Sequence, residues 1–222
     1  MAHRAGECFH EAMNAHAVST HLVAWLRTYA LTHDRNGFVI GVSGGVDSAV
    51  ASSLCARTEM PILCVEMPIH QAAEEVERAR DHVMGLCKTH ARVERCHVDL
   101  TRQFENFIAL CHNGCDHDGA LAKVNTRSRL RAALLYYQAT VRDALVVGTG
   151  NRVEQDGVGF FAKYGDGRMD LSPLGALNKS EVYALAHALQ VDRRIIDAPP
   201  TDGLWPDRRT DLEQIGDRKS VV

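Results

Sequence analysis

The chain has 222 residues, of which 45% are hydrophobic and 24% are charged, and its formal net charge is −3. These values are typical of a globular protein, and residues 1–222 are expected to form a single domain. A protein with this slightly negative net charge has no overall positive electrostatic potential, so no nucleic-acid partner is expected. Neither a run of about 18 apolar residues nor a signal-like N-terminus occurs, so we expect no membrane partner and a cytoplasmic location.

The first predicted element is a helix over about residues 8–32, where apolar residues recur at helical spacing. The apolar, β-branched run at 38–43 then predicts a strand that is buried on both faces. Ser-Gly-Gly-Val-Asp-Ser ends this run at residues 43–48, and a helix is expected to begin at Asp47. A strand, a glycine-rich turn and a helix N-terminus together form an anion site, because free N–H groups and the helix dipole point at one place. The motif therefore predicts a phosphate site.

Strands and helices continue to alternate along the rest of the chain. The predicted strands lie at 62–68, 92–100 and 143–151, and the predicted helices at 72–90, about 104–114, 123–140 and 178–189, followed by loop and a short helix at 211–216. The strand at 92–100 is the most polar and is expected near an edge of the sheet. This order predicts an α/β, doubly wound, mostly parallel sheet with helices on both faces. Ligands of such sheets lie beyond the carboxyl ends of the strands, so the turn at 43–48 and Gly-Thr-Gly-Asn at 148–151 are expected to face one pocket.

Two common phosphate-binding motifs do not fit the turn at 43–48. No lysine follows Gly44-Gly45 as a P-loop requires, and the glycines do not follow the G-x-G-x-x-G spacing. The carboxylate of Asp47 would repel a polyphosphate unless a cation lay between them, which indicates Mg²⁺. A tight strand-to-helix turn without a ligand is the alternative interpretation of this motif taken alone.

The motif resembles the SGGxDS pyrophosphate-binding loop of the ATP pyrophosphatases, which cleave ATP between the α and β phosphates and adenylylate a substrate oxygen. Within this group, Lys-Tyr-Gly-Asp-Gly at 163–167 and Pro-Leu-x-x-Leu-x-Lys at 173–179 resemble the ammonia-dependent NAD synthetases, over about residues 20–216. The resemblance implies a five-stranded, Rossmann-like sheet of the adenine nucleotide alpha-hydrolase type. It also implies that ATP adenylylates the nicotinate carboxylate of deamido-NAD, and that ammonia then releases NAD and AMP.

The same resemblance implies roles for individual residues. The implied ATP-binding residues are Gly41, Val42, Ser43, Gly44, Gly45, Val46, Asp47, Ser48, Thr149, Lys179 and Thr201. The implied substrate-binding residues are Arg129, Lys163 and Asp170, and the implied ligands of Mg²⁺ are Asp47 and Glu154. Asp47 and Lys179 are expected to be catalytic, because Mg²⁺ held by Asp47 and Glu154 would, together with the Lys179 ammonium, neutralise charge on the departing pyrophosphate. The ordinary alternatives are an exposed helix-start lysine for Lys179 and a solvated helix face for Arg129.

Three departures from the family pattern leave other functions open. The family places its metal-binding glutamate eight residues before the lysine of KYGDG, where this chain has Gln155, and Glu154 lies nine residues before it. A bulge could restore Glu154 to the metal. The family's C-terminal helices and His-Lys pair have no counterpart, and the segment after Pro68 is unlike the common loop. The alternatives are the same chemistry on another carboxylate, such as that of a sugar or an amino acid, and a non-catalytic nucleotide-binding subunit.

The expected partners follow from length and resemblance. A glutamine-using enzyme needs an additional glutaminase domain, for which 222 residues are expected to leave no room. Free ammonia or a separate glutaminase partner is therefore expected as the nitrogen source. The resemblance also implies a homodimer. Seven cysteines without a C-x-x-C pair indicate reduced thiols. Cys111, Cys115, His117 and Asp118 form a weak candidate zinc site, for which a polar loop is the more ordinary interpretation.

Overall fold

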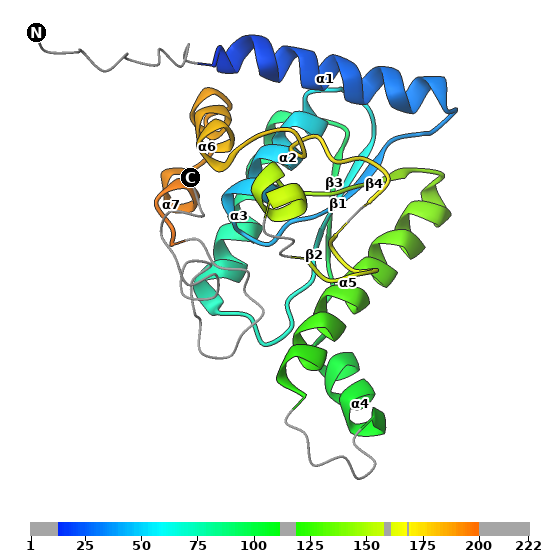
Figure 1. The fold of residues 1–222 in the computed structure, drawn as a ribbon. Helices are drawn as coiled ribbons and strands as arrows, with labels where there is room; N and C mark the ends of the chain where they lie inside the picture. The colour runs from blue at the N-terminus through cyan, green and yellow to red at the C-terminus, as the bar shows by residue number, and fades with distance from the viewer. Residues whose placement is uncertain (1–12, 112–118, 158–160, 168, 200–222) are drawn as a thin grey trace, which may run out of the picture.

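The centre of the fold is a parallel sheet with the strand order β3-β2-β1-β4. The computed structural model describes residues 13–111, 119–157, 161–167 and 169–199. The strands are β1 (Phe38–Gly41), β2 (Ile62–Glu66), β3 (Val93–His97) and β4 (Leu145–Val147). The predicted α/β class and parallel sheet are confirmed, and the polar β3 lies at an edge as predicted (Figure 1).

The expectation of five strands is wrong for the part of the chain that the structure describes, where the sheet has four. In the place of a fifth strand, Leu171 forms a single parallel bridge to Val147. The N–H of Gly148 donates to the carbonyl of Leu171 at 2.7 Å, and the N–H of Leu171 donates to the carbonyl of Val146 at 3.2 Å. Pro173, which has no N–H, follows two residues later, so the ladder cannot continue.

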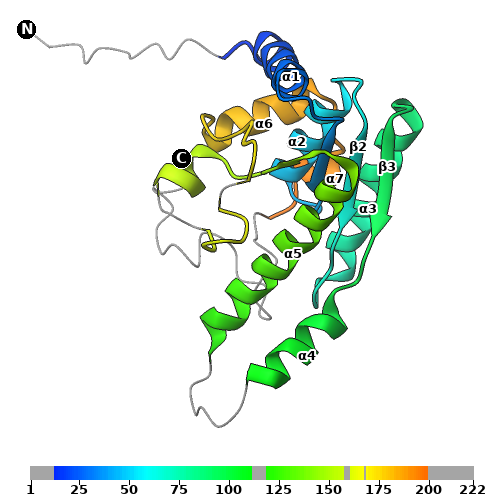
Figure 2. The ribbon, with the colours of Figure 1, turned by 90° about the vertical axis from the view of Figure 1, so that its right-hand side faces the viewer.

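Helices cover both faces of the sheet, as the alternation predicted (Figures 1 and 2). Phe38 and Ile40 of β1 join one core with α1, α2, α3, α6 and α7, whereas Val39 joins the other with α4 and α5. Successive residues of a strand point to opposite faces, so an apolar strand such as β1 has side chains buried on both faces of the sheet. The helices are α1 (Ala15–Thr32), α2 (Val46–Ala56), α3 (Ala73–Thr89), α4 (Thr101–Cys111), α5 (Ala120–Arg142), α6 (Lys179–Ala188) and α7 (Arg193–Ile196).

Most predicted helices are confirmed. The start of α6 shows how neighbouring residues decide where a helix begins. The side chain of Asn178 caps α6, and the Glu181 carboxylate accepts from the N–H of Asn178 at 2.7 Å, which completes the predicted capping box. The short helix α7 was not predicted. The first helix, predicted from about residue 8, begins at Ala15, where the side chain of Asn14 caps it. The predicted helix at 211–216 lies outside the described residues. Within the described ranges, no helix is both long and apolar enough to cross a bilayer.

Helix α2 is the most enclosed element on its face of the sheet. Every one of its residues is buried except Asp47. Its small side chains let α1, α3 and α6 all contact it. The hydroxyl groups of Ser52 and Ser53 donate to the carbonyl of Ala49 at 3.1 and 2.7 Å, so no hydroxyl needs water. The core therefore holds α2 firmly and leaves one acidic side chain at its N-terminus to serve the site.

His82 of α3 lies against this helix and makes the fold sensitive to acid. Its Nε2 atom lies 2.9 Å from the hydroxyl of Ser52. Burial lowers the pKa of His82 from its ordinary 6.5 to about 4. The unfolded chain therefore takes up this proton at a higher pH than the folded chain does. We expect the free energy of unfolding to fall by on the order of 2 to 3 kcal/mol between pH 6.5 and pH 4 because of this residue.

Urea unfolding of the wild type and of His82→Gln at pH 7, 5.5 and 4.5 measures this effect. The variant should be less stable at pH 7, because the contact with Ser52 changes, but its stability should fall less steeply with acid. His187→Gln, on the exposed side of α6, is the matched control and should keep the wild-type slope. Equal slopes for the wild type and His82→Gln would contradict the prediction.

Candidate active site

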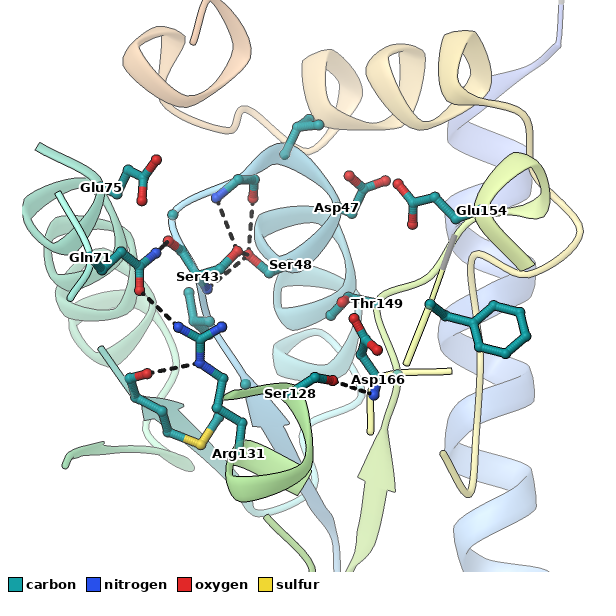
Figure 3. Close-up of a pocket in the computed structure, with 18 of the residues that line it drawn as sticks. Ser43, Asp47, Ser48, Gln71, Glu75, Ser128, Arg131, Thr149, Glu154 and Asp166 are labelled. Carbon is teal, nitrogen blue, oxygen red and sulfur yellow. Dashed lines mark hydrogen bonds between the residues drawn. The ribbon is translucent and has the colours of Figure 1, made fainter. Parts of the chain in front are cut away.

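The turn between β1 and α2, residues 42–45, forms one end of the site (Figure 3). Gly44 has a φ of +89°, and a Cβ atom there would lie 2.4 Å from the backbone oxygen of Glu75 in α3. The N–H of Ser43 donates to the hydroxyl of Ser48 at 3.2 Å, and this hydroxyl donates to the carbonyl of Gly45 at 3.0 Å. The turn is therefore folded back onto the N-terminus of α2, where N–H groups and the helix dipole favour an anion.

A charged cluster lies beside this turn. The ammonium group of Lys179, the first residue of α6, contacts Oδ2 of Asp47 and lies 3.6 Å from Oε1 of Glu154. The buried Asn151 donates from Nδ2 to Oδ1 of Asp47 at 3.1 Å. The three charged side chains are only 13%, 18% and 30% exposed for Lys179, Asp47 and Glu154. Figure 3 shows the carboxylates of Asp47 and Glu154 facing each other.

A π-helical turn, η1 (Val153–Gly157), decides which residue of the pair Glu154 and Gln155 enters the site. Such turns absorb one extra residue, and they are frequent at functional sites. Glu154 lines the cavity and lies near Lys179. Gln155 instead packs against Gly150, where a Cβ atom would lie 2.5 Å from its Nε2 atom. This segment is one residue longer than the family pattern. The π-helical turn takes up the extra residue and keeps a glutamate in the site.

A cavity of about 430 Å³ extends from this cluster, a size that suits a small molecule. It lies beyond the carboxyl ends of β1 and β4, and both glycine-rich turns line it, as predicted. All the predicted ATP and metal residues in the described ranges line it, namely Gly41, Val42, Ser43, Gly44, Gly45, Val46, Asp47, Ser48, Thr149, Glu154 and Lys179. Thr201 and most of the candidate zinc loop lie outside the described residues. Apolar side chains, including Met67, Val124 and Leu135, form much of the remaining wall.

The three predicted substrate residues do not line this cavity. Arg129 of α5 donates from Nε to the carbonyl of Lys163 at 3.0 Å. Oδ2 of Asp170 accepts from the N–H of Val146 at 2.8 Å, and Oδ1 accepts from the hydroxyl of Tyr136 at 3.4 Å. Burial, followed by the Asp170 carboxylate, raises the pKa of Tyr136, which keeps its hydroxyl a donor. In this structure these contacts hold the backbone of Lys163 against α5 and the side chain of Asp170 against α5 and β4.

The sequence did not single out a polar chain that joins α5 to the glycine-rich turn. Arg131 donates from Nε to the carbonyl of Met67 at 3.0 Å and from Nη2 to Oε1 of Gln71 at 3.5 Å. Gln71 in turn donates from Nε2 to the carbonyl of Ser43 at 3.1 Å. All these residues line the cavity. The position of Gln71, shortly after a parallel strand and thus at the ligand edge of the sheet, was the signal that could have found it.

The fold and the site together define a doubly wound α/β protein with a phosphate-type loop at the carboxyl edge of its sheet and an acid–lysine cluster beside that loop. This is the class of nucleotide-binding α/β enzymes. The chain belongs to the NAD synthase family, whose model matches residues 18–220. The resemblance seen in the motifs is thereby confirmed for the family.

Individual relatives agree with this membership. The chain is 36% identical over 197 residues to the NH(3)-dependent NAD(+) synthetase of Carboxydothermus hydrogenoformans, covering 88% of this chain and 78% of that protein. Among solved structures, the NMN synthetase of Francisella tularensis superposes with a TM-score of 0.85 at 33% identity, covering 92% of this chain and 82% of that one. The NH3-dependent NAD synthetase of Campylobacter jejuni superposes with a TM-score of 0.74 at 28% identity, covering 84% and 78%.

Proposed function

We propose that this protein is a ligase that uses ATP to convert the nicotinate carboxylate of deamido-NAD into the amide of NAD, with ammonia as the nitrogen donor. The carboxylate would first be adenylylated, with release of pyrophosphate, and ammonia would then displace AMP. The observation that carries the proposal is the cluster of Asp47, Glu154 and Lys179 beside the glycine-rich turn, at one end of a cavity large enough for a nucleotide, in a member of this family.

The chain's own residues would act mainly by positioning and by stabilising charge. The N–H groups of the turn and the N-terminus of α2 would hold the phosphates, and the ammonium of Lys179 would balance the charge of the leaving pyrophosphate. The apolar wall would keep water from the acyl adenylate. The donor set fits magnesium, which prefers one or two carboxylates together with phosphate oxygens. Asp47 and Glu154 would hold it, and it would supply further neutralisation of the polyphosphate.

A second candidate substrate is the mononucleotide form of nicotinate. The Francisella relative is named as an NMN synthetase, and its TM-score of 0.85 exceeds the 0.74 of the Campylobacter NAD synthetase. Both substrates present the same nicotinate carboxylate to ATP, so the cluster around Asp47 serves either. They differ in the part of the molecule that lies farthest from the reacting carboxylate.

A turnover assay with a panel of acids tests the proposal. Purified protein receives ATP, Mg²⁺ and ammonium together with deamido-NAD, nicotinate mononucleotide, a sugar acid or an amino acid. AMP, pyrophosphate and the amide are each measured. AMP together with NAD supports the first candidate, and AMP together with NMN supports the second. An amide from another acid, or nucleotide binding without AMP, would reject both.

We further propose a homodimer formed through α4 and α5, which lie side by side at one end of the molecule (Figure 2). Large apolar side chains are exposed on both helices, Phe107 and Leu110 on α4 and Leu121 and Tyr137 on α5. Large apolar side chains left exposed on two neighbouring helices support an interaction site there. Leu121 also lines the cavity, so this interface would adjoin the active site.

The dimer is expected to dissociate in Leu110→Glu, because a carboxylate in an apolar interface is left without a partner. Light scattering at micromolar concentration should give a dimer for the wild type and a monomer for the variant. Lys88→Glu, on an exposed position of α3, is the control and should remain dimeric. A monomeric wild type would overturn the proposal.

The remaining expectations belong to the same proposal. Ammonia would enter as the free molecule or come from a separate glutaminase, in line with the relatives named as NH(3)-dependent. The chain would act as a single domain. The five cysteines in the described ranges are free thiols, which supports a reducing, cytoplasmic setting.

A further inference from the structure

We propose that Lys179 is an internal counter-ion that keeps a divalent cation from the Asp47–Glu154 pair until the phosphates of a nucleotide draw its ammonium group away. The inference rests on the proposed function, since it concerns the same ATP and metal site. It deepens that function by stating an order: the metal binds together with the nucleotide and binds poorly to the protein alone.

The contacts of the lysine carry the first step. Its ammonium group contacts Oδ2 of Asp47 and lies 3.6 Å from Oε1 of Glu154. The carboxylates of Asp47 and Glu154 face each other across the site (Figure 3), and a divalent cation held by both would bind through the oxygens that the ammonium approaches. A cation and the ammonium therefore compete for the same atoms.

Electrostatics make this competition severe. The lysine side chain is only 13% exposed and that of Asp47 only 18%, so water screens the charges weakly. A divalent cation entering beside Lys179 would be repelled by the ammonium and would have to break its contact with Asp47. Two carboxylates are also too few to replace the hydration shell of magnesium, which usually needs substrate phosphates as well.

The structure also explains how the lysine can leave without disturbing the fold. Lys179 is the first residue of α6, and the reciprocal bonds between Asn178 and Glu181 hold the backbone at this helix start. Its flexible stem can turn the ammonium toward phosphates in the neighbouring turn while the helix stays in place. Asn151 continues to donate to Oδ1 of Asp47, so the carboxylate remains oriented after the lysine has moved.

Binding of Mn²⁺ to the nucleotide-free protein tests the proposal, because the signal of free Mn²⁺ in electron paramagnetic resonance reports bound metal without any turnover. Lys179→Met should bind one Mn²⁺ roughly tenfold more tightly than the wild type, or better. Lys179→Gln is measured alongside, so that the test does not depend on one variant folding. Lys88→Met, at an exposed position of α3, is the matched control and should bind like the wild type. The double variant with Asp47→Asn should lose the gain.

Unchanged affinity in both folded Lys179 variants would overturn the proposal, as would a gain that survives Asp47→Asn. The outcome is independent of the turnover assay. A protein that forms no amide but shows the gain in Mn²⁺ affinity would reject the proposed reaction and keep the lysine exchange, whereas an active enzyme without the gain would do the reverse.

Discussion

Asp47→Asn is expected to lower the rate of AMP formation by about three orders of magnitude while the protein stays folded. Asp47 is the one side chain of α2 that is not buried, so the change leaves the core intact. The amide keeps the size of the carboxylate but removes the charge that Lys179 contacts and that a metal would need. Pyrophosphate release with saturating ATP measures the effect, and thermal unfolding followed by circular dichroism checks the fold.

Asp143→Asn is the matched control for this substitution. Asp143 ends α5 with a φ of +50°, a conformation that asparagine also tolerates, and its ion pair with Arg35 lies at the surface. This variant should keep wild-type turnover. Full activity in Asp47→Asn would remove this carboxylate from the mechanism.

Gly44→Ala is expected to abolish nucleotide binding and to lower the free energy of unfolding by about 2 to 4 kcal/mol. With its φ of +89°, Gly44 has a backbone conformation that side chains rarely adopt. An added Cβ atom would also lie 2.4 Å from the backbone oxygen of Glu75, and helix backbone in the first turn of α3 cannot move aside as a side chain can. Either the turn or the packing of α3 on α2 must change. Urea unfolding and fluorescence titration with a labelled ATP analogue measure the two effects.

The neighbouring glycine provides the control for stability. Gly45 has an extended backbone, with φ −92° and ψ 162°, and an added Cβ atom would meet only the hydroxyl of Ser43, at 3.5 Å. Gly45→Ala should therefore unfold within about 0.5 kcal/mol of the wild type. If Gly44→Ala were equally stable and bound nucleotide normally, the strained turn would not matter for the site.

Local signals in the sequence were enough to predict most helices and strands and the glycine-rich turn of the site. The apolar, β-branched run at 38–43 favoured a strand buried on both faces, and the small residues after Asp47 suit a helix that others must approach closely. The capping box at 178–181 is decided within four residues. The glycine-rich turn depends on the same short-range chemistry, because backbone conformation and helix starts are governed by neighbouring residues.

Contacts between distant parts of the chain decided the rest. Lys179 meets Asp47 across 132 residues, and a π-helical turn, rather than any spacing rule, places Glu154 in the site and Gln155 against Gly150. Leu171 reaches the sheet as a single bridge, and Arg129 contacts the carbonyl of Lys163 outside the cavity wall. Sequence alone predicted the glycine-rich turn and the helix start that follows it, since these depend on local backbone and residue type. Only the tertiary structure determined which charges meet, since the packing of α6, α5 and the π-helical turn around the sheet sets those distances.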